Sequence, residues 1–140
     1  FIVGALKMNN DLERIGDHAV NIAKVAQRLV GESYIKPLKD IPAMGKITRS
    51  MLHDAVHSFI NQDTELAREV CARDDEVDEL YVRVRNDVME ILKKKKDKFE
   101  QGYDLISIAH ELERVADLTT NLGEEVVFIR EAKIIRHGLG

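Results

Sequence analysis

Acidic residues at helical spacing are the side chains in this sequence best suited to chemistry. Three pairs are each four residues apart: Glu13 and Asp17, Asp74 and Asp78, and Glu113 and Asp117. Residues four apart share one face of an α-helix, where two like charges cost about 0.2–0.5 kcal/mol. A multivalent cation reverses that cost, because carboxylate oxygens are hard ligands that can bridge metal ions. The pairs are therefore candidate metal ligands, although acid pairs also occur on ordinary solvated faces, where Arg14 and Arg114 could neutralise them.

Two of these pairs belong to an internal repeat. Residues 12–17 read Leu-Glu-Arg-Ile-Gly-Asp, and residues 112–117 read Leu-Glu-Arg-Val-Ala-Asp, at an offset of 100 residues. A shared helical period explains recurring apolar residues, but it does not explain Glu, Arg and Asp at matching places. We therefore interpret the chain as two structural repeats, the first represented only by its final helix. If the third and fourth helices are neighbours, Asp74 and Asp78 can join Glu113 and Asp117 on one wall.

Four helices must position these acids, and we expect them over about 2–30, 41–60, 64–96 and 103–135. Apolar residues in the first and last alternate spacings of three and four, which predicts helix-on-helix packing. The stripe of the first helix is Ala5, Met8, Leu12, Ile15, Ala19, Ile22, Ala26 and Leu29. The stripe of the last is Leu105, Ile108, Leu112, Val115, Thr119, Leu122, Val126 and Ile129. Gly102 is expected in the loop before that helix.

The predicted fold class is all-α, an antiparallel helical bundle made of one complete three-helix repeat plus the last helix of a preceding similar repeat. The expected divisions are 1–31 for that last helix, 32–40 for a linker, 41–136 for the three-helix repeat and 137–140 for a tail. The sequence starts inside an apolar-periodic segment, so we expect a piece of a longer protein. The unpaired first helix should pack on the second repeat or on another chain, which favours a homo-oligomer such as a homodimer.

Composition excludes several classes of function. The chain has 21 Lys and Arg against 25 Asp and Glu, a net charge of −4, which argues against a nucleic-acid partner. No window approaches 18 uninterrupted apolar residues, so no membrane span is predicted. The single cysteine, Cys71, rules out an internal disulfide and a zinc site of the Cys/His kind. Because no nucleophile–base pair or glycine-rich phosphate loop is present, we predict no catalytic residues and no enzyme.

The sequence resembles the PhoU family of phosphate-signalling regulators from bacteria and archaea. The resemblance rests on residues 11–18 (Asp-Leu-Glu-Arg-Ile-Gly-Asp-His), their counterpart at 112–117, and the spacing of Asp74 and Asp78. It implies two similar three-helix bundles side by side, with multinuclear clusters of iron or zinc held by Glu/Asp-x-x-x-Asp motifs. Carried over, the ligands of the second-repeat cluster are Asp74, Asp78, Glu113 and Asp117. The first-repeat ligands are Glu13 and Asp17, whose partner helix lies outside this sequence.

The resemblance also implies a regulatory role without catalysis. Such a protein restrains phosphate uptake and phosphate-starvation signalling, and its partners are a sensor histidine kinase and the ATPase subunit of the phosphate ABC transporter. We therefore expect a cytoplasmic protein that reaches the membrane only through these partners.

Two alternatives stay open at this point. One is a helical adaptor without metal. The other is a histidine phosphotransfer bundle using His110, since residues 107–112 (Ser-Ile-Ala-His-Glu-Leu) are similar to the phospho-acceptor box His-Glu-Leu-Arg-Thr-Pro. Val115 and Ala116 follow instead of the expected Thr-Pro. Carboxylates also accept Mn, Mg or Ca, so the residues alone do not choose the metal.

Overall fold

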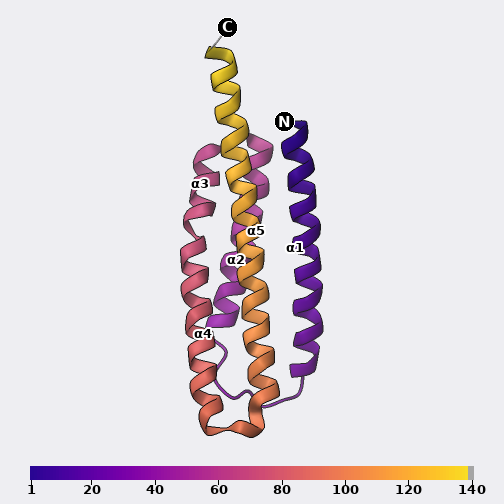
Figure 1. Ribbon diagram of the computed structural model, residues 1–140, viewed down its shortest axis with the longest axis vertical. Helices are drawn as coiled ribbons and strands as arrows, with labels where there is room; N and C mark the ends of the chain where they lie inside the picture. Colours follow the sequence, from indigo (N-terminus) through magenta and orange to yellow (C-terminus); the bar gives the residue numbers. More distant parts are fainter. Residues whose placement is uncertain (139–140) are drawn as a thin grey trace.

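The computed structural model describes residues 1–138, which fold into five α-helices and one 3-10 helix. The elements are α1 (Ile2–Leu29), α2 (Asp40–Asn61), α3 (Thr64–Ala72), α4 (Asp74–Lys94), η1 (Lys96–Lys98) and α5 (Phe99–Gly138). The described residues contain no strand, and successive long helices run in opposite directions (Figure 1). The predicted all-α antiparallel bundle is therefore confirmed. None of the described helices is both long and apolar enough to cross a membrane.

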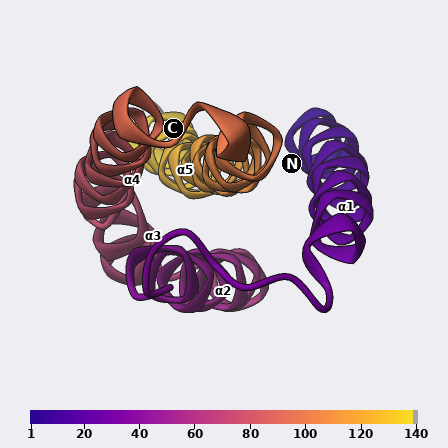
Figure 2. The same ribbon diagram turned by 90° about the horizontal axis from the view of Figure 1, so that it is seen from below.

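The central element is α5, which contacts α1, α2, α3 and α4. Seen from one end, α5 lies between α1 and α4, and α2 faces it from the opposite side (Figure 2). The apolar stripe predicted for this helix is buried except at Leu112, which is half-buried. Burial extends further round α5 to include Ala109, Ala116 and Leu118, because neighbours pack on several of its flanks.

The packing face of α1 is rotated relative to the predicted stripe. Of that stripe, Met8, Ile15 and Leu29 are buried, but Leu12, Ala19 and Ala26 are exposed. Gly4 and Val25 are buried instead. At Gly4 a Cβ would lie 2.6 Å from the Cδ1 atom of Ile129, so glycine permits a close approach of α5. Because α1 is apolar on two flanks, the spacing alone did not reveal which flank α5 covers.

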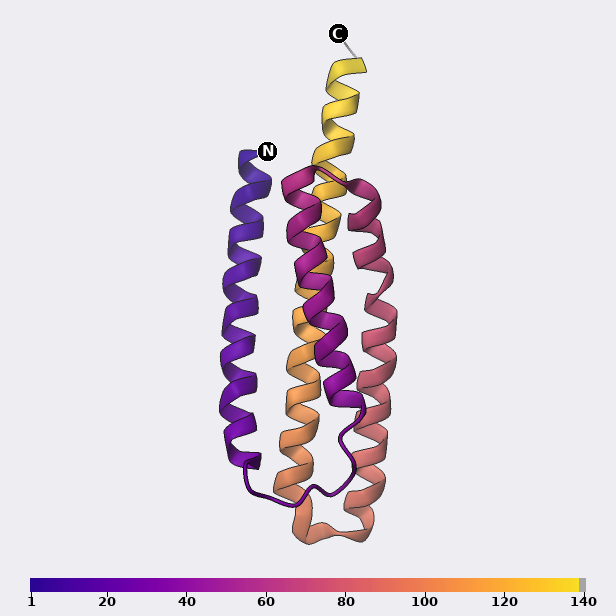
Figure 3. The same cartoon turned by 180° about the vertical axis from the view of Figure 1, so that it is seen from behind.

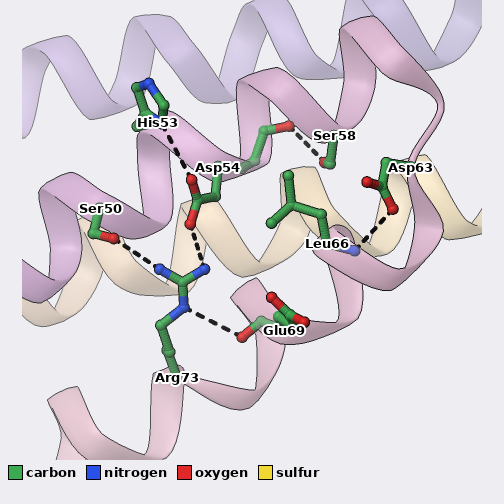
Figure 4. Close-up of polar contacts among 9 residues, drawn as sticks. Ser50, His53, Asp54, Ser58, Asp63, Leu66, Glu69 and Arg73 are labelled. Atoms are coloured by element: carbon green, nitrogen blue, oxygen red, sulfur yellow. Dashed lines mark hydrogen bonds and ion pairs between the residues drawn. The ribbon is translucent and has the colours of Figure 1, made fainter.

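The single helix predicted over 64–96 is wrong, because the chain breaks it at Arg73. The amide of Arg73 donates to the carbonyl of Val70 (3.2 Å), three residues back, instead of to that of Glu69. The Nε atom of Arg73 donates to the Glu69 carbonyl at 3.4 Å and replaces the lost helical bond (Figure 4). Asp63 caps the start of α3, as its carboxylate accepts from the amide of Leu66 at 3.0 Å.

The linker between α1 and α2 crosses the lower end of the bundle, where Gln101 holds it (Figure 3). The buried Gln101 accepts from the amide of Ile35 at 2.6 Å and donates to the carboxylate of Glu32 (2.9 Å) and the carbonyl of Ser33 (3.0 Å). The start of α5 at Phe99 corrects the expected loop near Gly102. The structure describes the predicted tail 137–140 only to Gly138, which still belongs to α5.

Candidate metal centre

The first turns of α4 and the middle of α5 bring three predicted ligands together. Asp74 and Asp78 lie one turn apart on α4, and Asp117 lies on the adjacent α5. One carboxylate oxygen from each of these residues lies within 4.8 Å of the others. Two oxygens bound to one ion at about 2.0–2.4 Å are at most about 4–5 Å apart. The three oxygens are therefore spaced closely enough to be ligands of the same ion.

Burial of neighbouring residues fixes the orientation of these carboxylates. Val77 on α4 and Ala116 on α5 are fully buried between the helices. Their immediate neighbours Asp78 and Asp117 consequently lie at the edge of the helix interface, half-buried and exposed respectively. Asp78 and Asp117 thus lie at the surface of the bundle rather than in its core.

Glu113, the fourth predicted ligand of this cluster, lies one turn before Asp117 and is half-buried. It is outside the group of three oxygens, but it shares their electrostatic environment. Burial raises the pKa of Glu113, and the nearby Asp117, Asp78 and Asp74 raise it further. The structure therefore places all four predicted carboxylates of the second repeat, hereafter the carboxylate cluster (Asp74, Asp78, Glu113 and Asp117), in one small region.

The carboxylate cluster carries negative charge that the protein itself does not compensate. Burial raises the pKa of Asp74 to about 6, with further contributions from Asp78 and Asp117. Burial likewise raises the pKa of Asp78, followed by the effect of Asp117. The Oδ1 atom of Asp74 is buried and has no hydrogen-bond partner. Within residues 1–138 no member forms an ion pair, so neither Arg14 nor Arg114 neutralises the cluster.

Glu13 and Asp17, the two ligands predicted for the first repeat, are exposed on α1. In the described part of the chain they are not grouped with a third acid, histidine or cysteine. Glu13 instead lines a groove of about 780 Å³ between α1 and α5, opposite Asn121 and Glu124. Lys7 also lines this groove, so its walls carry mixed charge. No member of the carboxylate cluster lines this groove.

Further polar residues lie near these sites. Glu124 contributes to the raised pKa of Asp74, and it continues the row of polar residues along α5 that contains Glu113 and Asp117. His18 on α1 contacts Glu111 on α5, with 2.5 Å between Nδ1 and Oε2. This contact followed from no sequence signal, since its two residues are 93 positions apart. His110 is exposed and lies beside the ring of Tyr81, 5.9 Å between centroids.

The fold is thus an all-helical bundle in which carboxylates of two adjacent helices converge on one surface. The family model described as PhoU domain matches residues 1–26 and 41–126. The chain belongs to the PhoU family, as the sequence resemblance predicted.

Individual relatives support this assignment. A protein of Clostridium acetobutylicum named phosphate-specific transport system accessory protein PhoU homolog is 39% identical over 94% of this chain and 60% of its own length. A homologue of the same name from Aquifex aeolicus is 38% identical over 97% of this chain and 62% of its own length. The chain therefore spans about three fifths of the length of these curated relatives.

Solved structures give the same result for the fold. The crystal structure of PhoU from Pseudomonas aeruginosa superposes with a TM-score of 0.89 at 27% identity, over 94% of this chain and 63% of that one. The phosphate transport system regulatory protein PhoU from Streptococcus pneumoniae superposes with a TM-score of 0.84 at 28% identity, over 93% and 61%.

Proposed function

We propose that this chain is part of a PhoU-type regulator that restrains phosphate uptake and phosphate-starvation signalling. Membership of the PhoU family supports this role, and the relatives from Clostridium and Aquifex are named as accessory proteins of phosphate-specific transport. The proposed partners are the ATPase subunit of the phosphate ABC transporter and its sensor histidine kinase. In this proposal the protein acts in the cytoplasm, as a homodimer and without catalysis.

The carboxylate cluster is proposed to bind iron or zinc in a multinuclear site. The single observation that carries this proposal is the convergence of Asp74, Asp78 and Asp117, none of which forms an ion pair within residues 1–138. These three carboxylates would hold one ion, and Glu113 would supply further carboxylate oxygens for a second. An all-oxygen donor set also suits manganese, magnesium or calcium, and the metal analysis described below distinguishes among them.

Glu13 and Asp17 are proposed as ligands only in a longer protein. On α1 they present two carboxylates to solvent and need further donors from a neighbouring helix. The relatives extend well beyond the part that this chain matches, so such a helix can come from the rest of the polypeptide.

The proposed coupling between metal and regulation is electrostatic. Metal ions would cancel the repulsion among Asp74, Asp78 and Asp117, and so would hold α4 against α5 in one fixed arrangement. The exposed surface of these two helices would then be ordered for a partner when the site is filled.

Metal analysis and a cellular assay together test the proposal. Protein purified without chelator is predicted to contain more than one equivalent of metal by mass spectrometry, and the double variant Asp78→Asn/Asp117→Asn is predicted to lose it. In cells lacking their own PhoU, the longer protein should keep a phosphate-starvation promoter silent in phosphate-rich medium, and the double variant should not. The control Asp75→Asn, an exposed neighbour outside the cluster, should behave as the parent.

The outcomes separate the alternatives. Full promoter repression by a metal-free protein would support the adaptor without metal. Failure of the longer parent protein to repress the promoter would overturn the regulatory role itself.

A further inference from the structure

Two histidines form a pair on the exposed face of α2, a helix that contributes no residue to the carboxylate cluster. His53 and His57 are four residues apart, so their side chains leave the same face of the helix. Their ring centroids are 4.2 Å apart, with the planes tilted by 42°. The side chain of His53 is 67% exposed, and His57 is exposed as well. The two imidazoles are thus adjacent to each other and open to solvent.

The contact between His53 and Asp54 determines which ring nitrogen is free. The Nδ1 atom of His53 lies 3.1 Å from Oδ1 of Asp54 (Figure 4). The other oxygen of Asp54 accepts from Nη2 of Arg73 at 2.6 Å. Since this carboxylate acts as an acceptor, Nδ1 of the neutral ring carries the proton and donates it to the hydrogen bond. The Nε2 atom of His53 is then left with an unshared pair of electrons.

Asp54, the carboxylate that contacts His53, is held in place by a residue outside α2. Arg73, at the joint between α3 and α4, binds Ser50 Oγ at 2.9 Å in addition to Asp54 and the Glu69 carbonyl. Asp54 is therefore fixed between a histidine of its own helix and an arginine of the next. A metal-bound histidine typically donates its second N–H to a carboxylate that orients the ring, which is the role Asp54 has in this arrangement.

We propose that His53 and His57 chelate one zinc, nickel or copper ion, with water at the remaining positions and Asp54 orienting His53. Two nitrogens bound at about 2.1 Å to a tetrahedral ion lie about 3.4 Å apart, which neighbouring rings at this separation reach by small side-chain rotations. Histidine pairs at this spacing on a helix bind zinc in known motifs. Imidazole nitrogen selects these borderline metals, whereas the all-oxygen carboxylate cluster also accepts hard ions.

The charges around the two histidines affect how strongly the pair would bind a metal ion. Asp54 neutralises Arg73, and the exposed Arg49 lies one turn before His53 on the same helix. The positive charge of that arginine repels a bound cation. We therefore expect the site to bind metal that is added to the protein, but not to retain metal through purification. Protons compete for the same electron pairs, so metal affinity should fall in acid.

Titration with nickel by calorimetry tests the proposal on the full chain. The Asp78→Asn/Asp117→Asn background removes the carboxylate cluster, so the result is independent of the proposed function. In this background one nickel site is expected, and His57→Ala should weaken it at least tenfold. Asp54→Asn should weaken it by about tenfold while His53 and His57 remain. His110→Ala removes an exposed histidine of α5 and is the matched control, with no expected change.

Copper electron paramagnetic resonance gives a second readout that does not depend on affinity. In the Asp78→Asn/Asp117→Asn background the spectrum should show coupling to two imidazole nitrogens, and the further change His57→Ala should leave coupling to one. Both histidines are exposed, so circular dichroism should report an unchanged fold for their variants. Nickel affinity that is the same in His57→Ala and the parent, or a copper spectrum with oxygen ligands alone, would overturn the proposal.

Discussion

Replacement of Asp74 by asparagine should stabilise the metal-free protein at neutral pH. Burial and the nearby Asp78 and Asp117 raise the pKa of Asp74 from its ordinary value of 3.8 to about 6. This difference corresponds to about 3 kcal/mol of unfavourable interaction with the ionised form. Asp74 is only partly buried, and solvent screening reduces that figure to about 1 kcal/mol. For a chain of 140 residues, Asp74→Asn should therefore raise Tm by about 3 °C.

The pH dependence of this effect has a definite sign. A carboxyl group whose pKa is higher in the folded state binds more protons when folded than when unfolded between about pH 4 and 6. The free energy of unfolding therefore falls as pH rises through that window, and the destabilisation is complete above it. The advantage of Asp74→Asn should accordingly be present at pH 7 and largely lost at pH 4, where the carboxyl group is protonated in the folded state and partly protonated in the unfolded state.

Urea unfolding of chelator-treated protein measures the free energy of unfolding of Asp74→Asn and of the parent at pH 4 and at pH 7. Asp75→Asn is the matched control, because it removes an adjacent exposed charge from the same first turn of α4. The control should change stability much less than Asp74→Asn, because Asp75 adds only a minor part of the repulsion at Asp74 and its charge also favours the helix N-terminus. A loss of stability in Asp74→Asn at pH 7, or an equal gain at both pH values, would refute the electrostatic reasoning.

Three further predictions concern metal, packing and the linker. A cluster-bound metal at a free concentration one hundred times its Kd should raise the free energy of unfolding by about 2.7 kcal/mol, measured by urea unfolding, and Asp78→Asn/Asp117→Asn should abolish the gain. Gly123→Ala places a Cβ 2.9 Å from a backbone oxygen of α3 and should lower the free energy of unfolding by about 1–3 kcal/mol. At Gly16 a Cβ meets nothing within 4 Å, so Gly16→Ala should raise the free energy of unfolding by up to about 1 kcal/mol. Thermal unfolding that ranks the two variants the other way would contradict the packing described. Gln101→Ala should cost about 1–3 kcal/mol and speed amide exchange at residue 35, and unchanged exchange would show that Gln101 does not hold the linker.

The helical architecture was predictable because its main signal is periodic. The stripe of α5 is apolar on the flanks that its neighbours cover, so spacing and burial agree there. The first helix is apolar on two flanks, and only the position of α5 decides that Val25 is buried and Leu12 is exposed. The break at Arg73 was not predictable, because it depends on bonds to Ser50 and Asp54, which come from another helix.

The candidate site was predictable to the extent that local spacing determines it. Asp74 and Asp78 share a helix face by their spacing, and the internal repeat singled out Glu113 and Asp117. The sequence alone did not predict that α4 and α5 are neighbours, or that Asp74 has a buried oxygen without a hydrogen-bond partner, because both depend on the tertiary structure.

Anomalous diffraction from crystals grown with zinc or iron tests metal binding by the carboxylate cluster, because it locates each ion and identifies its element. We predict a peak among Asp74, Asp78 and Asp117, with a second ion beside Glu113, and no such peaks in Asp78→Asn/Asp117→Asn. An empty carboxylate cluster in metal-containing crystals, or metal that stays there in the double variant, would contradict the proposed metal site.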